Sequence, residues 1–271
     1  PARTASPASP TATVPSAPPG VTSRFARYVA LGDSYTAAPG VPGRQSQDGC
    51  MRSDGNYPHL LAAALGVRRL VDVSCSGAAT ADVRRPQLPG LAPQLDAVTR
   101  DTDLVTIGLG GNDLDLFGRL ISGCLRRDAS GAAGSPCTDT LGPTIPTALA
   151  QIERHVADVV TAVRAAAPGA RVVLVGYPQI VPASGGCEQM PFAPGDRAFV
   201  RQVNRGLAEA VRRAAATVRA TYVDLWAASA DHDMCAADPW INGLTAQGAA
   251  PFHPFAAEQA AAARLIEAKL R

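Results

Sequence analysis

Short apolar runs alternate with amphipathic stretches along most of the chain. The runs are four to six residues long, which is typical of strands buried on both faces. We expect strands at 28–31, 70–73, 104–109, 171–176 and 221–225. Helical spacing predicts helices at 57–65, 91–99, 113–121, 146–166 and 196–218, and one from Pro254 to the C-terminus. Strands alternating with helices predict an α/β fold, with a parallel sheet of about five strands between helical layers.

The first 24 residues differ in composition from the rest. They consist mainly of Pro, Ala, Ser and Thr, with hardly any large apolar side chain. Because such a segment buries too little surface to offset its ordering entropy, we expect a disordered tail over 1–24. Of all 271 residues, 46% are hydrophobic, which is enough for one sizeable core. We therefore expect a single domain over 25–271.

Charge and hydropathy exclude two kinds of partner. The net charge of +2 is small and evenly spread, so we expect no nucleic-acid partner. No window reaches the roughly 20 apolar residues of a membrane span. No apolar signal-peptide core begins the sequence either, so we expect that any export signal has been removed.

The six cysteines lie mostly in stretches rich in Gly, Ser and Pro, which are typical of loops. None forms the C-x-x-C pair usual in zinc sites, so we expect no metal. An even number of loop cysteines favours disulfides and hence a secreted protein. Fifteen pairings are possible. We prefer pairing in chain order, in which each bridge fixes one loop: Cys50–Cys75, Cys124–Cys137 and Cys187–Cys235.

Polar, glycine-containing segments follow the first three strands. Ser34 lies in "GDS", Gly77 in "SGAAT" and Asn112 in "GGND". The carboxyl ends of parallel strands meet at one edge of the sheet, where α/β proteins bind ligands. Alone, Ser34 could simply cap a helix, but the three segments together favour a site. Asp33 and Asp113, in the same segments, are expected to hold the loops by bonding backbone N–H groups. The G-x-S-x-G, P-loop and G-x-G-x-x-G motifs are absent.

One of the four histidines has a position suited to chemistry. His253 precedes Pro254, which fits the first position of a helix, so the imidazole lies on a loop where it can face a cleft. His59 and His155 fit helical patterns, and His232 lies in a polar loop. We interpret these three as surface residues.

Four blocks of the sequence resemble the GDSL, or SGNH, hydrolase family. "ALGDSYTA", "SGAAT", "GLGGND" and "PFHP" occur in the family's order and span nearly all of residues 25–271. The cysteines and Pro-rich lead are similar to those of secreted actinobacterial lipases and esterases of that family. The resemblance implies a flavodoxin-like three-layer α/β/α fold. It makes Ser34 the nucleophile and His253 its base. It also implies an oxyanion hole formed by the backbone N–H groups of Ser34 and Gly77 and the amide of Asn112.

The sequence departs from the family pattern beside the histidine. Ala250 stands where the family usually has an aspartate, and Phe255 where asparagine is common. An imidazole base needs an acceptor on its second nitrogen. We therefore predict a Ser34–His253 dyad oriented by the main chain, with the Ala250 carbonyl as acceptor. The alternative is a carboxylate from the preceding loop, namely Asp231, Asp233 or Asp238. Of these, Asp238 is the closest to His253 in sequence.

The expected function is that of a secreted, cofactor-free serine esterase or lipase. It would work by ping-pong acyl transfer through an ester on Ser34, on a small-molecule or lipid ester, and as a monomer. Walls for the acyl group are expected in the long insertions 36–56, 122–145 and 181–196. The alternatives on the same fold are a phospholipase A-type acyl hydrolase and a carbohydrate acetylesterase. A binding module that kept the fold would not require the whole Ser, Gly, Asn and His set.

Overall fold

The computed structural model describes residues 24–125, 136–244 and 247–271. The strands are β1 (Arg27–Gly32), β2 (Arg69–Asp72), β3 (Leu104–Gly108), β4 (Arg171–Val175) and β5 (Thr221–Val223). The α-helices are α1 (Ser34–Ala37), α2 (Tyr57–Leu65), α3 (Leu116–Cys124), α4 (Pro136–Leu141), α5 (Ile145–Ala166), α6 (Arg197–Thr217), α7 (Leu225–Ala228) and α8 (Ala256–Leu270). The expected tail over 1–24 lies outside the described residues, apart from Arg24.

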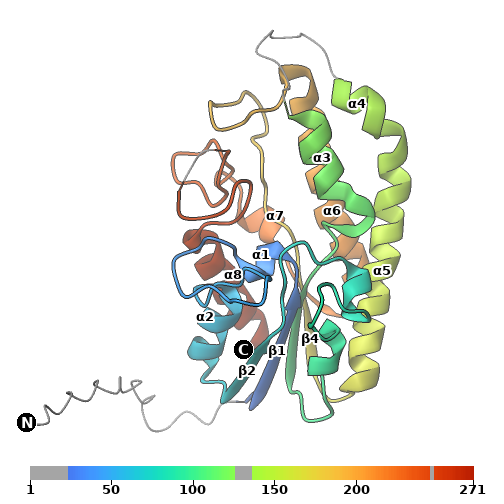
Figure 1. Ribbon diagram of the computed structural model, residues 1–271, viewed down its shortest axis with the longest axis vertical. Coiled ribbons are helices and arrows are strands. Elements are labelled where there is room, and N and C mark those ends of the chain that lie inside the picture. The colour runs from blue at the N-terminus through green and yellow to red at the C-terminus, as the bar shows by residue number, and fades with distance from the viewer. Residues whose placement is uncertain (1–23, 126–135, 245–246) are drawn as a thin grey trace, which may run out of the picture.

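The strands form one parallel sheet in the order β2-β1-β3-β4-β5 (Figure 1). This is the flavodoxin-like order, so the predicted α/β fold is confirmed. From β1 the chain moves outward to β2 and then crosses back to β3. Such a reversal opens a crevice at the carboxyl ends of the two strands beside it. The register pairs Gly32 at the end of β1 with Gly108 at the end of β3, which places the crevice there.

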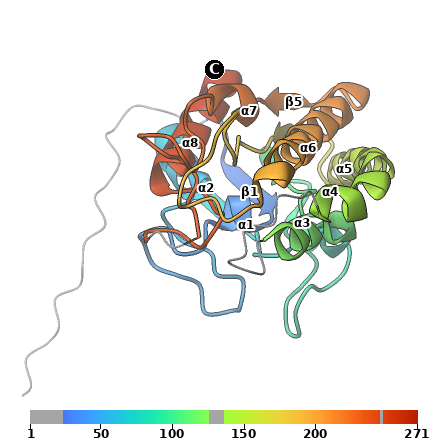
Figure 2. The same cartoon turned by 90° about the horizontal axis from the view of Figure 1, so that it is seen from above.

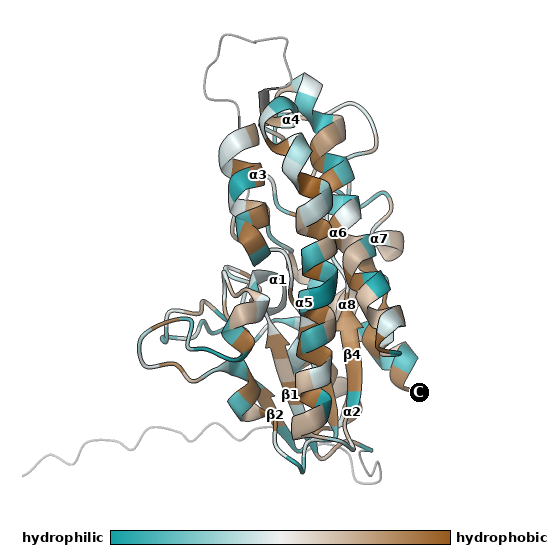
Figure 3. Cartoon of the chain, turned by 90° about the vertical axis from the view of Figure 1, so that its right-hand side faces the viewer, coloured by the Kyte–Doolittle hydropathy of each residue, from teal (hydrophilic) through white to brown (hydrophobic). Residues whose placement is uncertain are grey.

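Helices cover both faces of the sheet. Viewed from above, α2 and α8 lie on one side, and α5 and α6 on the other (Figure 2). Alternate residues of β1 face the two layers: Tyr28 and Ala30 pack with α2 and α8, while Val29 and Leu31 pack with α5 and α6. The strands are accordingly among the most hydrophobic segments in Figure 3. Full burial of such a Val or Leu side chain stabilises the folded state by roughly 1.5–3 kcal/mol. Packing against both helical layers therefore fixes the strand ends, which carry the polar segments.

Three disulfides join the six cysteines in chain order. Cys50–Cys75 ties the 36–56 insertion to the segment after β2, two residues before Gly77. Cys124–Cys137 joins the end of α3 to α4. Cys187–Cys235 connects two loops that are 48 residues apart in the sequence. The bridges therefore fix the long loops that surround the carboxyl edge of the sheet.

We expect reductant to lower the melting temperature of the protein. A disulfide of this kind contributes about 2–4 kcal/mol, chiefly because it restricts the unfolded chain. The melting temperature, followed by circular dichroism with and without dithiothreitol, measures the effect. EDTA is the control and should leave both stability and activity unchanged. Free thiols titrated in the unreduced, denatured protein would contradict the pairing.

Two predicted helices differ from the structure. The helix expected at 91–99 is wrong: only a 3₁₀ turn over Gln94–Ala97 forms. The reason is that the Gln94 side chain bonds both backbone groups of Gly32, N–H at 2.9 Å and C=O at 3.0 Å, and fixes this segment as a loop. The helix expected at 113–121 instead begins at Leu116, because Asp115 has a left-handed backbone (φ 55°).

Candidate active site

Ser34 stands where β1 turns into α1. The Asp33 side chain caps this short helix by accepting the Tyr35 backbone N–H at 2.9 Å. The turn is so tight that a Cβ on Gly32 would lie 2.2 Å from Oγ1 of Thr36. Glycine is thus required at this point of the "GDS" motif. The turn presents Ser34 to the crevice while leaving the residue only 7% exposed.

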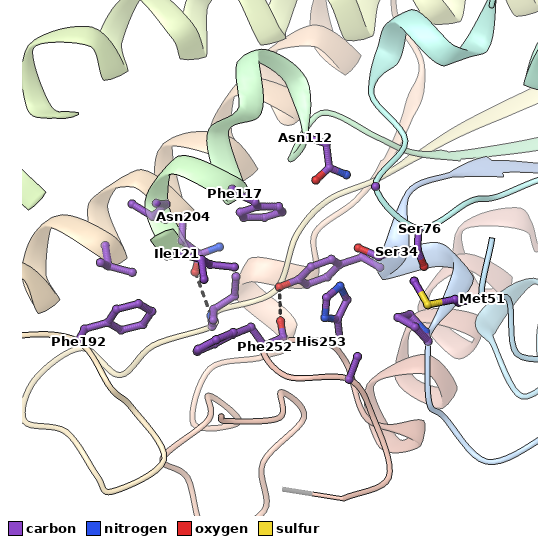
Figure 4. Close-up of a pocket in the computed structure, with 18 residues that line it drawn as sticks. Ser34, Met51, Ser76, Asn112, Phe117, Ile121, Phe192, Asn204, Phe252 and His253 are labelled. Atoms are coloured by element: carbon purple, nitrogen blue, oxygen red, sulfur yellow. Dashed lines mark hydrogen bonds between the residues drawn. The ribbon is translucent and has the colours of Figure 1, made fainter. Parts of the chain in front are cut away.

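A cavity of about 380 Å³ brings the predicted site residues together. Ser34, Gly77, Asn112 and His253 all line it. In Figure 4, Ser34 and His253 lie at one end of the cavity, and Phe192 lies at the opposite end. Among the described residues, the Ser34 hydroxyl makes no hydrogen bond, so Ser34 and His253 are not hydrogen-bonded to each other in this structure. Catalytic hydrogen bonds of this kind often tighten only when substrate is bound.

The orientation of His253 is set by the main chain. Its Nδ1 lies 2.7 Å from the carbonyl oxygen of Pro251. A carbonyl can only accept, so Nδ1 carries the hydrogen and Nε2 keeps its lone pair. Burial lowers the pKa of His253 below its ordinary value, partly opposed by the Pro251 hydrogen bond. The lowered pKa favours the neutral imidazole, the form that can accept a proton.

The expectation that the Ala250 carbonyl orients the histidine is wrong by one residue. That oxygen already accepts the backbone N–H of His253 at 3.1 Å and Nδ2 of Asn242 at 3.2 Å. The next carbonyl, of Pro251, faces the imidazole instead. Phe252 follows it with a left-handed backbone (φ 63°), which allows the chain to turn this sharply. A main-chain acceptor is present, as the dyad requires.

None of the three alternative aspartates is bonded to His253. Asp238 is 80% exposed and lies beside another histidine, His232, whose Nδ1 is 2.8 Å from the Asp238 carbonyl oxygen and 3.6 Å from its carboxylate. Asp233 accepts the backbone N–H of Cys235 at 2.8 Å. Asp231 is exposed. Among the residues that the structure describes, the His253 imidazole is bonded to the Pro251 carbonyl and not to a carboxylate.

Three residues that line the cavity near Ser34 carry hydrogen-bond donors with capacity to spare. Among the described residues, the backbone N–H groups of Ser34 and Gly77 have no acceptor. Gly77 has φ +81°, a conformation that favours glycine, and this turns its peptide into the cavity wall. The Asn112 amide donates one hydrogen to the Ala78 carbonyl at 3.0 Å and has a second one to give. The arrangement can stabilise a developing negative oxygen without adding a charge.

The two aspartates of the motifs hold loops, as their positions predict. Asp113 accepts the backbone N–H of Thr80 at 2.7 Å, its hydroxyl at 2.5 Å, and Nδ1 of His155 at 2.9 Å. This connects the loops that carry Gly77 and Asn112 to α5. Asp33 is fully buried, and burial raises its pKa to about 7, although hydrogen bonds from Tyr177 and Tyr35 favour its ionised form.

An aromatic cluster behind the site was not predicted from the sequence. The Tyr35 ring lies 5.3 Å from that of Tyr177, 5.6 Å from that of Phe117 and 5.6 Å from that of His253, centroid to centroid. The Tyr35 hydroxyl donates to the Phe252 carbonyl at 2.8 Å (Figure 4). The nucleophile turn thus contacts the loop that carries the histidine. The sequence signal that could have indicated this cluster is an aromatic residue just after a strand, as Tyr177 is after β4.

The walls of the cavity are mostly apolar and come from both helices and loops. The insertions 36–56 and 181–196 contribute a few residues, including Met51 and Phe192, but the described part of 122–145 contributes none. The expected origin of the walls is therefore only partly right. Most of the apolar lining comes from α3, from α6 and from the loops after β4 and before α8: Phe117, Leu120, Ile121, Val200, Ile180 and Phe252.

Among the residues that the structure describes, no group of three or more His, Cys, Asp or Glu side chains is placed to hold a metal ion. The same residues include no helix with the length and apolar character needed to cross a bilayer.

The sheet order and the polar groups gathered at its carboxyl edge define an α/β enzyme with its site between β1 and β3.

Comparisons with known proteins identify the family. The model of the GDSL-like Lipase/Acylhydrolase family matches residues 30–261. Lipase 2 from Streptomyces coelicolor is 44% identical over 236 residues, which cover 84% of this chain and 80% of that protein. Two solved structures, of phospholipase A1 from Streptomyces albidoflavus NA297 and of an extracellular lipase from Streptomyces rimosus, each match with a TM-score of 0.75 and 30% identity, covering 90% of this chain and 99% of theirs. The chain belongs to the GDSL-like lipase/acylhydrolase family and is a carboxylic ester hydrolase.

Proposed function

We propose that the protein is a secreted lipase or esterase that hydrolyses esters through an acyl-enzyme on Ser34. The observation that carries the proposal is the state of His253. The Pro251 carbonyl holds its Nδ1 hydrogen, which leaves Nε2 as a base in the cavity that Ser34 lines. Secretion is supported by the three disulfides and by the likeness to an extracellular lipase.

The proposed reaction has two similar halves. Nε2 of His253 takes the hydroxyl proton as Oγ of Ser34 bonds to the ester carbonyl carbon, and the carbonyl oxygen becomes negative. That oxygen lies among the N–H groups of Ser34 and Gly77 and the amide of Asn112. The bond to the leaving alkoxide then breaks, and the imidazolium returns the proton to it. The same imidazole then deprotonates a water molecule that attacks the acyl carbon. As the bond to Ser34 Oγ breaks, the imidazolium returns this proton to Oγ, which releases the acid and restores the Ser34 hydroxyl.

The apolar cavity supports an acyl group longer than acetyl. Its wall beyond Ser34 is built from Phe, Leu, Ile and Val side chains and ends at Phe192 (Figure 4). A lipid acyl ester fits such a wall better than an acetylated sugar does, because hydroxyl groups would lose hydrogen bonds to water there. A phospholipase A-type activity is the second candidate, and the structural likeness to phospholipase A1 favours it.

A series of p-nitrophenyl esters tests the proposal. From acetate through butyrate to octanoate, kcat/KM should rise, because each buried methylene contributes about 0.8 kcal/mol, roughly fourfold. Ile121→Trp, which fills the cavity beside Phe117, should selectively slow octanoate. Leu60→Trp is the matched control, because Leu60 is a surface residue of α2 that is 37% exposed. A flat or falling series would contradict an acyl role for the cavity.

A further inference from the structure

A buried chain of hydrogen bonds connects the two loops that flank the site. The backbone N–H of Gly111, the residue before Asn112, lies 2.8 Å from the Tyr177 hydroxyl oxygen. That hydroxyl in turn bonds the carboxylate of Asp33, the residue before Ser34. Tyr177 is 2% exposed and Asp33 is fully buried. The phenol therefore adds a second link between the segments that follow β3 and β1, beside the hydrogen bond from the Asp33 backbone N–H to the Gly108 carbonyl at 2.9 Å.

The direction of each hydrogen bond is fixed by chemistry. A backbone N–H can only donate, so the Tyr177 oxygen accepts from Gly111. Its own proton is then free to go to Asp33, whose second oxygen already accepts the Tyr35 backbone N–H at 2.9 Å. Every polar group of this hydrogen-bond chain has its partner, and no water is needed to complete it. Loss of the phenol oxygen would leave the Gly111 N–H without its acceptor in a dry interior.

The packing around Tyr177 holds its hydroxyl in place. The ring meets those of Tyr35 and Phe117 edge-on, at interplanar angles of 71° and 80°. Both neighbours line the cavity. A rotamer change at Tyr177 would have to displace them, so the hydroxyl is a rigid spacer rather than a mobile contact.

We propose that Tyr177 is a positioning residue of the oxyanion hole, because its hydroxyl sets the distance between the Asn112 amide and Ser34. The inference rests on the function proposed above. A displacement of about 1 Å at a catalytic group can cost roughly 100-fold. Tyr177→Phe should therefore lower kcat about 10- to 100-fold, while KM stays within about twofold.

A double-mutant cycle separates positioning from general damage. Because Tyr177 acts through Asn112, adding Tyr177→Phe to Asn112→Ala should cost less than about threefold in kcat, far below its effect on the wild type. Tyr28→Phe is the matched control. It removes another buried phenol, which is bonded to Thr106 Oγ1 at 2.7 Å and does not line the cavity, and should leave kcat unchanged.

Two outcomes would overturn the inference: an unchanged kcat in Tyr177→Phe, or a loss that is equally large in the Asn112→Ala background. If Tyr177→Phe does not fold, Asp33→Asn is judged by the same cycle. It replaces one of the two carboxylate oxygens by an N–H₂ donor and so leaves one acceptor for the bonds from Tyr177 and Tyr35. Failure of the proposed function has a different signature, because Ser34→Ala would then keep its esterase activity.

Discussion

Replacement of Asn112 by alanine is expected to lower kcat by about 100- to 1000-fold and to leave KM nearly unchanged. The loss corresponds to roughly 3–4 kcal/mol of transition-state stabilisation, which is typical of one oxyanion donor. The amide has one hydrogen committed to the Ala78 carbonyl, and the other is free for the substrate oxygen. Because that oxygen becomes negative only in the transition state, ground-state binding should change little.

Asn112→Asp sharpens this test because it preserves the size of the side chain. A carboxylate beside the developing oxyanion adds repulsion, so this variant should be at least as slow as Asn112→Ala. Steady-state kinetics on a p-nitrophenyl ester, with melting curves to show that both variants fold, provide the measurement. A kcat for Asn112→Ala within threefold of the wild type would remove Asn112 from the mechanism.

His253→Ala is expected to have the largest effect, a loss of roughly a millionfold in kcat, the order seen when a serine protease loses its histidine. The variants Asp231→Asn, Asp233→Asn and Asp238→Asn should each stay within about tenfold of the wild type. The reason is that Pro251 already supplies the acceptor for Nδ1. Loss of a true orienting aspartate lowers kcat by about 10,000-fold in serine proteases.

The pH profile provides a second check on the same dyad. The base must be neutral, and burial lowers the pKa of His253 below its ordinary value. Activity should therefore persist to a lower pH than an exposed histidine would allow.

For the aspartate variants, a drop in kcat of about a thousandfold or more at one of the three positions, in a protein that folds, would contradict a main-chain dyad and restore a carboxylate triad.

The sheet could be predicted because its central strands, β1, β3 and β4, are buried on both faces. A short continuous apolar run such as "LVTIGL" is typical of a strand that is buried on both faces. Parallel strands also place their carboxyl ends at one edge. The strand pattern therefore predicts that Ser34, Gly77 and Asn112 lie close together, and all three line one cavity. These inferences depend on local pattern and on topology.

Other features depend on contacts between distant residues, which a sequence pattern does not contain. The carbonyl that meets His253 is chosen by the turn at Phe252 and by the competing bonds to Ala250. Tyr177 resembles any other aromatic residue in the sequence, and only the fold places its hydroxyl between Gly111 and Asp33. The late start of α3 likewise follows from the left-handed backbone at Asp115.

Covalent labelling with a fluorophosphonate tests the central claim, nucleophilic catalysis by Ser34, most directly. The wild-type protein should gain one adduct, seen by intact-mass spectrometry and located by peptide mapping on Ser34, and its esterase activity should fall in step with labelling. Ser34→Ala should gain no adduct and hydrolyse no ester above background. An adduct on another residue, or an active Ser34→Ala enzyme, would contradict the account.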